Sequence, residues 1–377
     1  MIMSIDNKDK ILNVPNLRFP GFGGEWKTLF VDDVCPEFQS GKNIKAENIK
    51  SEGLYPVYGG NGLRGYTDIY NHDGTYVLIG RQGALCGNVR LVEGRNYITE
   101  HAIAVSSSNE HCIYFLYYLF YKMNLGQYSD QSAQPGLAVN KLLRLKLHIP
   151  LKDEQTKIAK ILTLLDTRIA TQNKIIEGLK KLKVAIIENV FKAKCCNHKI
   201  GDIITQVSIR NKSNNVPNVL SVSNKQGFVE QSEQFEDRTV ASEDVTNYKI
   251  VRTNDFAYNP ARINVGSIAR LKQHESGIVS PMYICFHTKK DVLPEYLEIF
   301  FHTQFFKHEM YKRLEGSVRL CLSYEGLTNI PIFIPGIPAQ LEISKRIFVF
   351  ERKIATEEYY LNALEQQKQY LLQQIFI

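Results

Sequence analysis

Hydrophobic residues recur at spacings of three and four along two stretches of the chain, residues 149–191 and 334–376. This spacing keeps apolar side chains on one face of an α-helix, and its continuity over many turns is typical of a coiled-coil seam. The apolar seam positions are Ile158, Leu162, Leu165, Ile169, Ile176, Leu179 and Ile186 in the first stretch, and Ile343, Ile347, Phe350, Ile354, Leu361, Leu364 and Leu371 in the second. At about 1.5 Å per residue, each stretch predicts a rod of roughly 60 Å.

The two stretches are copies of one another at a fixed offset of 185 residues. They align without a gap, from an Ile-Pro pair at the start to a Phe at the end of each copy. The polar interruptions of the seam also match, because Gln172 and Lys183 correspond to Glu357 and Lys368. A shared pattern of polar exceptions favours two helices that pair with each other over two independent amphipathic helices.

An antiparallel arrangement of this pair offers one register in which Lys183 faces Glu357 and Gln172 faces Lys368. Polar contacts inside an apolar seam can fix the register of a coiled coil. The alternative is that these side chains run along the edge of the seam and keep their polar groups in water.

Two heads precede the rods, at about residues 20–148 and 197–333, and both consist of short strand patterns separated by Gly, Asn and Pro. The heads resemble each other weakly. Asp33-Val34 matches Asp202-Ile203, and Gly87-Asn88-Val89 matches Gly266-Ser267-Ile268, with extra residues entering the second copy between these points. The sequence therefore predicts an α+β protein with two pseudo-symmetric mixed α/β domains separated by two long antiparallel coiled-coil helices.

The predicted division of the chain follows from these patterns. It comprises an N-terminal extension (1–19), a first globular domain (20–150), a central helix (151–192), a second globular domain (193–335) and a C-terminal helix (336–377). Aromatic-rich helical stretches at Cys112–Tyr121 and Pro294–Phe301 are predicted to be core helices, because they are periodic and almost free of charge.

Composition narrows the class of protein. With 377 residues, of which 44% are hydrophobic, the chain can bury two ordinary cores. We find no signal-peptide pattern and no apolar run of membrane-spanning length, so we expect a cytoplasmic protein with no membrane contact. The seven cysteines lack the spacing of a zinc site, and Cys195-Cys196 with His198 lacks further ligands, so no metal and no cofactor are expected.

Positive charge is concentrated in one part of the chain. The net charge is +7, but residues 141–199 alone carry +9. Neither head is basic by itself, so contact with DNA has to come from local clusters. For the basic helix, a solvated face, a docking surface for an acidic partner and contact with the DNA backbone all remain open.

Polar, Gly-rich loops in both heads are the candidates for base recognition. They combine amide and guanidinium groups, which read adenine and guanine edges in the major groove, although each such residue can also serve a turn or a phosphate. The candidate DNA-binding residues are Lys42, Asn43, Tyr58, Asn61, Arg64, Tyr66, Arg81 and Gln82 in the first head, and Asn224, Lys225, Asn259, Arg262, Asn264, Arg313, Arg319 and Tyr324 in the second.

No catalytic constellation is complete in the sequence. Ser40-Gly41-Lys42-Asn43 lacks the outer residues of a P-loop. Asn259-Pro260-Ala261-Arg262 lacks the second Pro and the aromatic residue of the adenine methyltransferase motif, and Glu25-Trp26-Lys27 lacks the Pro-Asp segment of a nuclease. We therefore expect no catalytic residues in this chain.

Three features together resemble the specificity subunit of type I restriction-modification systems. They are the segment from Leu17 to Trp26, which reads Leu-Arg-Phe-Pro-Gly-Phe-Gly-Gly-Glu-Trp, the Ile-Pro-(x)4-Gln segment that enters each rod, with Ile158 to Arg168 after the first, and the strand pattern around Gly80 and Gly87. The resemblance covers almost the whole chain. One departure is that Pro338-Ala339-Gln340 replaces Asp153-Glu154-Gln155 in the second copy.

This resemblance implies a non-catalytic DNA-binding subunit. Each target recognition domain would read one half of a bipartite site in double-stranded DNA, while the rods set the spacer and dock two methyltransferase subunits. Partner subunits would supply methylation from S-adenosylmethionine and ATP-dependent translocation and cleavage. The alternatives are a stand-alone DNA methyltransferase or nuclease with its own recognition domains, and a coiled-coil adaptor that binds proteins.

Overall fold

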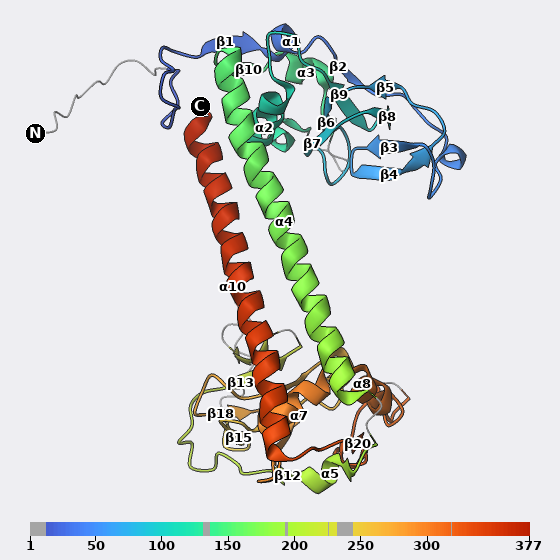
Figure 1. Cartoon of the computed structure of the whole chain (residues 1–377), viewed down its shortest axis with the longest axis vertical. Coiled ribbons are helices and arrows are strands. Elements are labelled where there is room, and N and C mark those ends of the chain that lie inside the picture. Colours follow the sequence, from blue (N-terminus) through green and yellow to red (C-terminus); the bar gives the residue numbers. More distant parts are fainter. Residues whose placement is uncertain (1–12, 131–135, 193–194, 225, 232–243, 318) are drawn as a thin grey trace, which may run out of the picture. The chain divides into compact units, whose positions relative to one another are not determined.

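The computed structural model describes residues 13–130, 136–192, 195–224, 226–231, 244–317 and 319–377 (Figure 1). Lys225, one of the candidate DNA-binding residues, lies outside them. The chain forms two compact units. Unit 1 comprises residues 1–173 and 359–377, and unit 2 comprises residues 174–358.

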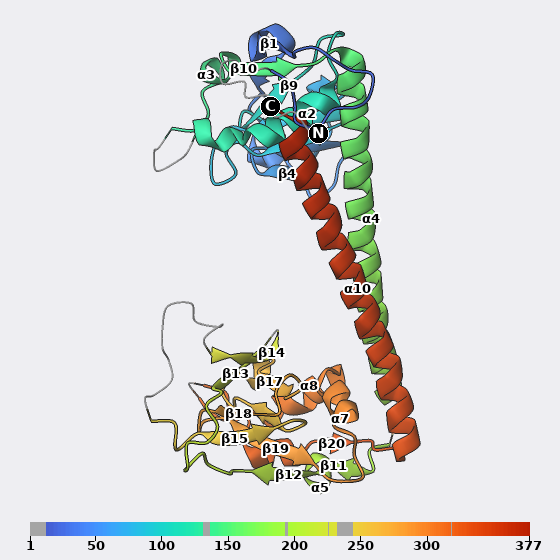
Figure 2. The ribbon, with the colours of Figure 1, turned by 90° about the vertical axis from the view of Figure 1, so that its left-hand side faces the viewer.

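Two long helices, α4 (Lys152–Phe191) and α10 (Ile337–Ile375), each contribute to both units. In unit 2, Lys180 pairs with Glu358 and Lys183 with Glu351, so residue numbers rise along α4 while they fall along α10. Figures 1 and 2 show the two helices side by side and antiparallel within each unit. The predicted fold class, with mixed α/β domains and long antiparallel helices, is confirmed.

The burial of the helices follows the seam pattern. All fourteen apolar seam positions are buried or half-buried, and none is exposed. The start of α4 and the end of α10 also enter the core of unit 1, because Ile158, Leu162, Leu372 and Ile375 belong to it. Apolar contacts therefore set the helix register.

The predicted polar register is wrong. Lys183 Nζ lies 3.1 Å from Glu351 Oε1 rather than against Glu357, and Lys368 Nζ lies 2.5 Å from Asp166 Oδ1 rather than against Gln172. The physical reason is that long charged side chains at the seam edge reach whichever opposite charge the apolar register brings near.

Unit 1 contains two four-stranded sheets. One has the order β2-β9-β6-β7, with all neighbours antiparallel, and the other has the order β4-β3-β8-β5. The strands are β1 (Lys27–Phe30), β2 (Phe38–Ser40), β3 (Tyr55–Gly59), β4 (Gly62–Thr67), β5 (His72–Asp73), β6 (Tyr76–Gly80), β7 (Val89–Val92), β8 (Arg95–Ile98), β9 (Ala102–Val105) and β10 (Lys146–Ile149). The short helices are α1 (Val31–Val34), η1 (Ala46–Asn48), α2 (Ile113–Met123), η2 (Leu125–Tyr128) and α3 (Val139–Leu143).

Unit 2 repeats the first sheet in the order β12-β19-β16-β17, again antiparallel throughout. The strands are β11 (His198–Lys199), β12 (Ile204–Val207), β13 (Leu220–Ser223), β14 (Gly227–Glu230), β15 (Lys249–Arg252), β16 (Phe256–Tyr258), β17 (Ile268–Arg270), β18 (Ser276–Val279), β19 (Ile284–Thr288) and β20 (Pro331–Ile332). The short helices are α5 (Ile200–Ile203), η3 (Ile263–Val265), α7 (Pro294–Phe301), α8 (Gln304–Tyr311) and α9 (Tyr324–Thr328).

The matched residues of the two heads occupy the same structural positions. The backbone N–H of Phe30 donates to Asp33 Oδ2 at 2.8 Å, and that of Lys199 donates to Asp202 Oδ2 at 2.7 Å, at the start of α1 and α5. The aromatic helices α2 and α7 are core helices, as predicted, since Phe115 and Phe300 are fully buried. The pseudo-symmetry seen in the sequence is thus present in the backbone.

Candidate nucleic-acid interface

A hollow of about 440 Å³ in unit 1 gathers three of the candidate DNA-binding residues. Asn61 lies in the β3–β4 turn, Arg64 lies in β4, and Gln82 follows β6. The hollow is lined by Gly60, Asn61, Arg64, Gln82, Gly83 and His101. Amide and guanidinium groups from separate parts of the chain therefore share one concave surface.

Close backbone packing holds these loops together. A Cβ at Gly60 would lie 2.7 Å from the His101 carbonyl oxygen, so only glycine lets the hairpin turn approach this closely. The Arg81 N–H donates to the same oxygen at 2.9 Å, and the Arg81 carbonyl accepts from the Leu137 N–H at 2.9 Å. Arg81 is half-buried, and its backbone hydrogen bonds join the segment after β6 to the segments that contain His101 and Leu137.

The other candidates in unit 1 are more scattered. Lys42 and Asn43 are exposed beyond the end of β2, outside the hollow. Tyr58 is half-buried and packs against the small core cluster of Leu78, Val92, Ile98, Ala102 and Ala104. Tyr66 is half-buried in β4, where its N–H donates to the Lys50 carbonyl at 2.9 Å.

A second hollow in unit 1, of about 430 Å³, adjoins the same hairpin turn. Its lining includes Gly59 to Gly62, the segment Gly87 to Arg90, and Tyr121 and Asn124 at the end of α2. Arg90 is exposed and makes no ion pair within the described parts of the chain. The sequence analysis missed Arg90, although it directly follows the matched Gly87-Asn88-Val89 segment and a comparison of the repeats could have flagged it.

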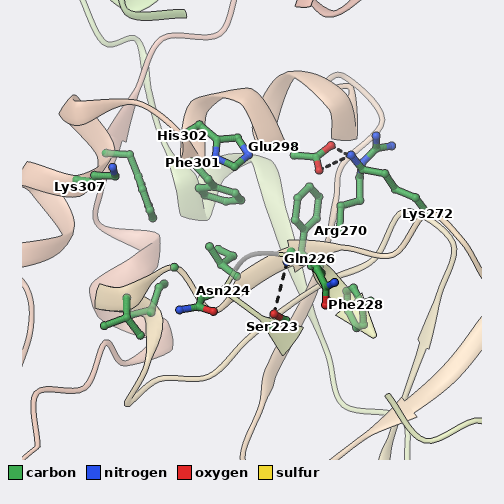
Figure 3. A pocket seen from close by; sticks show the side chains of 18 of the residues that line it. Ser223, Asn224, Gln226, Phe228, Arg270, Lys272, Glu298, Phe301, His302 and Lys307 are labelled. Carbon is green, nitrogen blue, oxygen red and sulfur yellow. Dashed lines mark hydrogen bonds and ion pairs between the residues drawn. The ribbon is translucent and has the colours of Figure 1, made fainter. Parts of the chain in front are cut away.

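Unit 2 has a larger hollow, of about 660 Å³, in the corresponding place (Figure 3). It lies between the β13–β14 turn, the segment that leads into β17, and helices α7 and α8. Two candidates, Asn224 and Asn264, line it, and Phe228, Phe256, Phe301 and Phe306 provide its apolar part. Both units therefore place a hollow beside a hairpin turn and a strand that directly follows a Gly-x pair, Gly87-Asn88 before β7 and Gly266-Ser267 before β17.

Charged groups surround this hollow unevenly. Arg270 is bound by Glu295 and by Glu298, and Lys272 Nζ lies 2.6 Å from Glu298 Oε1; the Glu298 contact with Arg270 is drawn in Figure 3. Lys307, from α8, lines the hollow and makes no ion pair with any residue that the structure describes. Sequence reasoning missed Lys307, because nothing in its local pattern marks the face of α8 that borders the hollow.

The remaining candidates in unit 2 mostly serve the fold. Asn259 Oδ1 accepts from the Ala261 N–H at 3.1 Å, which is a turn contact, and Arg313 binds Glu309 Oε2 at 2.7 Å. Tyr324 packs against the core at the start of α9, where burial raises the pKa of its hydroxyl. Exposed candidates outside the hollow are Arg262 and Arg319.

Neither unit contains an obvious metal site in its described part, where no group of three His, Cys, Asp or Glu residues is placed to hold an ion. Across the same residues, no helix is both long and apolar enough to cross a membrane.

The fold defines a class of protein with a duplicated mixed α/β domain, a polar hollow in each copy and two long antiparallel helices. Residues 23–181 match the family model described as type I restriction modification DNA specificity domain. This match confirms the resemblance recognised in the sequence.

Curated relatives agree with this assignment. The type I restriction enzyme EcoprrI specificity subunit of Escherichia coli is 49% identical over 148 residues, which is 38% of this chain and 36% of that protein. The type I restriction enzyme MjaVIII specificity subunit of Methanocaldococcus jannaschii is 24% identical over 225 residues, or 53% of this chain and 49% of that protein. The chain thus matches about a third to a half of the length of these relatives.

Solved structures share the fold over nearly the whole chain. The type I restriction-modification S subunit from M. genitalium superposes with a TM-score of 0.64 at 17% identity, covering 97% of this chain and 99% of that one. A chain from a structure of type I R-M complex assembly and conformational transition gives a TM-score of 0.55 at 12% identity, covering 92% and 96%. At these identities, the likeness concerns the fold.

Proposed function

We propose that this chain is the DNA specificity subunit of a type I restriction-modification complex in the cytoplasm. Each recognition domain reads one half of a bipartite site in double-stranded DNA, and the α4–α10 pair sets the unread spacer. The chain carries no catalysis itself. Methyltransferase subunits and an ATP-dependent restriction subunit supply the chemistry.

The observation that carries this proposal is the repeated hollow. Each unit places amide and cationic side chains beside a hairpin turn, on sheets with equivalent strand order. Such groups donate to base edges and phosphates. Two copies joined through a stiff pair of helices bind both half-sites together only when the spacing between them is correct, because only then does the first contact raise the effective concentration for the second.

Exposed apolar side chains on the long helices support docking of partner subunits. In unit 2, Phe348 and Val349 are exposed on α10, and Val349 lines a surface cavity of about 500 Å³ with Ile186 and Phe350. Apolar patches on helices of this kind are typical of protein interfaces. We assign this surface to the methyltransferase subunits.

Mapping methylated adenines in cells that express this chain with its methyltransferase partner tests the proposal. The expected result is a split motif with a fixed gap. Exchanging residues 200–333 for those of a relative should change one half of the motif and leave the other half and the gap intact. A continuous motif, or a chain that methylates or cuts DNA without partners, would contradict the proposal.

A further inference from the structure

Arg90 of unit 1 and Ala269 of unit 2 occupy the same position in the repeated sheet. Arg90 of β7 pairs with Leu78 of β6, and Ala269 of β17 pairs with Ala257 of β16. Both side chains line the hollow of their own unit. The duplicated fold therefore presents different side chains to the two hollows at one equivalent position.

The hairpin turn beside each hollow meets this position in the same way. A Cβ at Gly62, the first residue of β4, would lie 2.9 Å from Arg90 Nη2 and 3.3 Å from its Cζ. A Cβ at Gly227, the first residue of β14, would lie 3.5 Å from Ala269 Cβ. Because Gly62 has no side chain, the Arg90 guanidinium can lie directly against the turn.

The Arg90 guanidinium is available to a ligand. It is exposed, and its side chain makes no hydrogen bond or ion pair with any residue that the structure describes. By contrast, the arginine that lines the hollow of unit 2, Arg270, is held by Glu295 and Glu298. A guanidinium only donates hydrogen bonds, so the free one in unit 1 fits a ligand that presents acceptor atoms.

The rest of this hollow suits a base edge. Its volume is about 430 Å³, and the amides of Asn61, Asn88 and Asn124 line it together with Arg90. No carboxylate belongs to its lining in the described part of unit 1, so no acidic group competes for the guanidinium. A planar donor fork that lies against the turn and borders a concave surface matches an object that enters the hollow.

We propose that Arg90 reads a guanine in the half-site bound by unit 1, and that Ala269 leaves the equivalent position of unit 2 without this contact. This inference rests on the proposed function. In the major groove guanine presents two adjacent acceptors, N7 and O6, whereas adenine places its N6 amino group beside N7. Every guanidinium nitrogen donates, so Arg90 pairs with both guanine acceptors and leaves the adenine amino group facing another donor.

Mapping methylated adenines in cells that also express the methyltransferase partner tests this assignment. The half of the motif that persists when residues 200–333 are exchanged belongs to unit 1, and it should contain a G·C pair. Arg90→Ala should lower the preference for that G·C pair over A·T about ten- to hundredfold and leave the other positions intact. Arg144→Ala is the matched control, because Arg144 is another exposed arginine of unit 1 and lines neither hollow, and it should leave the motif unchanged.

Binding measurements on the assembled methyltransferase complex separate a base contact from a phosphate contact. With Arg90→Ala, the target duplex and one in which that G·C pair is changed to A·T should bind about equally, with the salt dependence of the wild type. An equal loss of affinity for every duplex, with the slope of log K against log salt reduced by about 0.9, would make Arg90 a phosphate contact and overturn the inference.

The motif itself separates this inference from the function on which it rests. A split motif whose unit 1 half lacks a G·C pair, or keeps all its bases in Arg90→Ala, would overturn the inference alone. The absence of a split motif in the wild type would overturn the proposed function together with it.

Discussion

Gln155 and Gln340 make the same pair of hydrogen bonds in the two units. Gln155 Oε1 accepts from the Cys112 N–H at 2.8 Å, and its Nε2 donates to the Pro150 carbonyl at 2.9 Å. Gln340 Oε1 accepts from the Leu293 N–H at 2.8 Å, and its Nε2 donates to the Pro335 carbonyl at 2.8 Å. In each unit the glutamine therefore joins the start of a long helix to the residue that directly precedes the aromatic core helix.

Replacing either glutamine by alanine should destabilise only the unit that contains it. Both side chains are almost fully buried, at 1% and 0% exposure, so Gln155→Ala and Gln340→Ala each leave buried backbone groups without partners. The expected cost is about 1–3 kcal/mol in the free energy of unfolding. Amide hydrogen exchange should show faster exchange near Cys112 in the first variant and near Leu293 in the second.

Gln366→Ala is the control for both glutamine variants. Gln366 is exposed on α10, and its replacement should change stability by less than about 0.5 kcal/mol. If Gln155→Ala or Gln340→Ala behaved like this control, the paired hydrogen bonds would have no role in holding the helices to the heads.

Arg18 and Glu154 explain why the two copies of the helix start differ. Arg18 donates from Nε and Nη2 to the two Glu154 carboxylate oxygens, each at 2.8 Å, and Glu154 is 1% exposed. The corresponding Ala339 of the second copy is exposed and takes no such partner. The departure from the family pattern thus coincides with the absence of a buried charge at that position.

Replacing Arg18 alone should lower the free energy of unfolding more than replacing Arg18 and Glu154 together. Arg18→Met leaves the buried Glu154 carboxylate without its counter-charge, and a loss of about 3–5 kcal/mol is expected. The double variant Arg18→Met with Glu154→Leu should recover most of that loss. Urea unfolding of the four proteins of this double-mutant cycle measures the effect, and equal costs for the single and double variants would contradict it.

The long helices and the repeat could be predicted because period and duplication are visible in the sequence itself. The seam residues Ile158 and Ile354, for example, are buried as their spacing requires. The polar register could not be predicted, because Lys183 reaches Glu351 through a flexible chain whose partner depends on packing elsewhere. A long lysine side chain at the seam edge can reach several acidic residues of the opposite helix without any change in the apolar register.

The polar hollow of unit 1 was predicted only in part. Asn61, Arg64 and Gln82 are brought together, since Gly-rich turns mark loops that can approach one another. His101, which also lines the hollow, was missed because its 3.1 Å contact with Gln82 joins segments that are separate in the sequence. Composition identifies loops, whereas tertiary contacts decide which side chains share a hollow.

Gly87 and Gly83 form a matched pair for testing close backbone approach. Both have φ of +87°, but a Cβ at Gly87 would lie 2.1 Å from the Gly126 nitrogen, while nothing lies within 4 Å of one at Gly83. Both alanine variants carry the left-handed backbone strain of about 1–2 kcal/mol. Gly87→Ala should cost a further ~1–3 kcal/mol from overpacking, measured by urea unfolding. Equal costs would show that η2 and the segment before β7 can move apart without loss of stability.

Lys307 should contribute to DNA affinity without contributing to base choice. It lines the hollow of unit 2 and is bound to no acidic residue in the described part of the chain, so it is available to a phosphate. Each phosphate contact changes the slope of log K against log salt by about 0.9. In the assembled methyltransferase complex, Lys307→Ala should reduce that slope by about one and weaken binding to all target sequences alike.

Lys290→Ala is the control, because Lys290 is exposed and does not line the hollow, and it should leave the slope unchanged. Fluorescence anisotropy over a range of salt concentrations measures both, and a change of target sequence in Lys307→Ala would instead make this lysine a base contact.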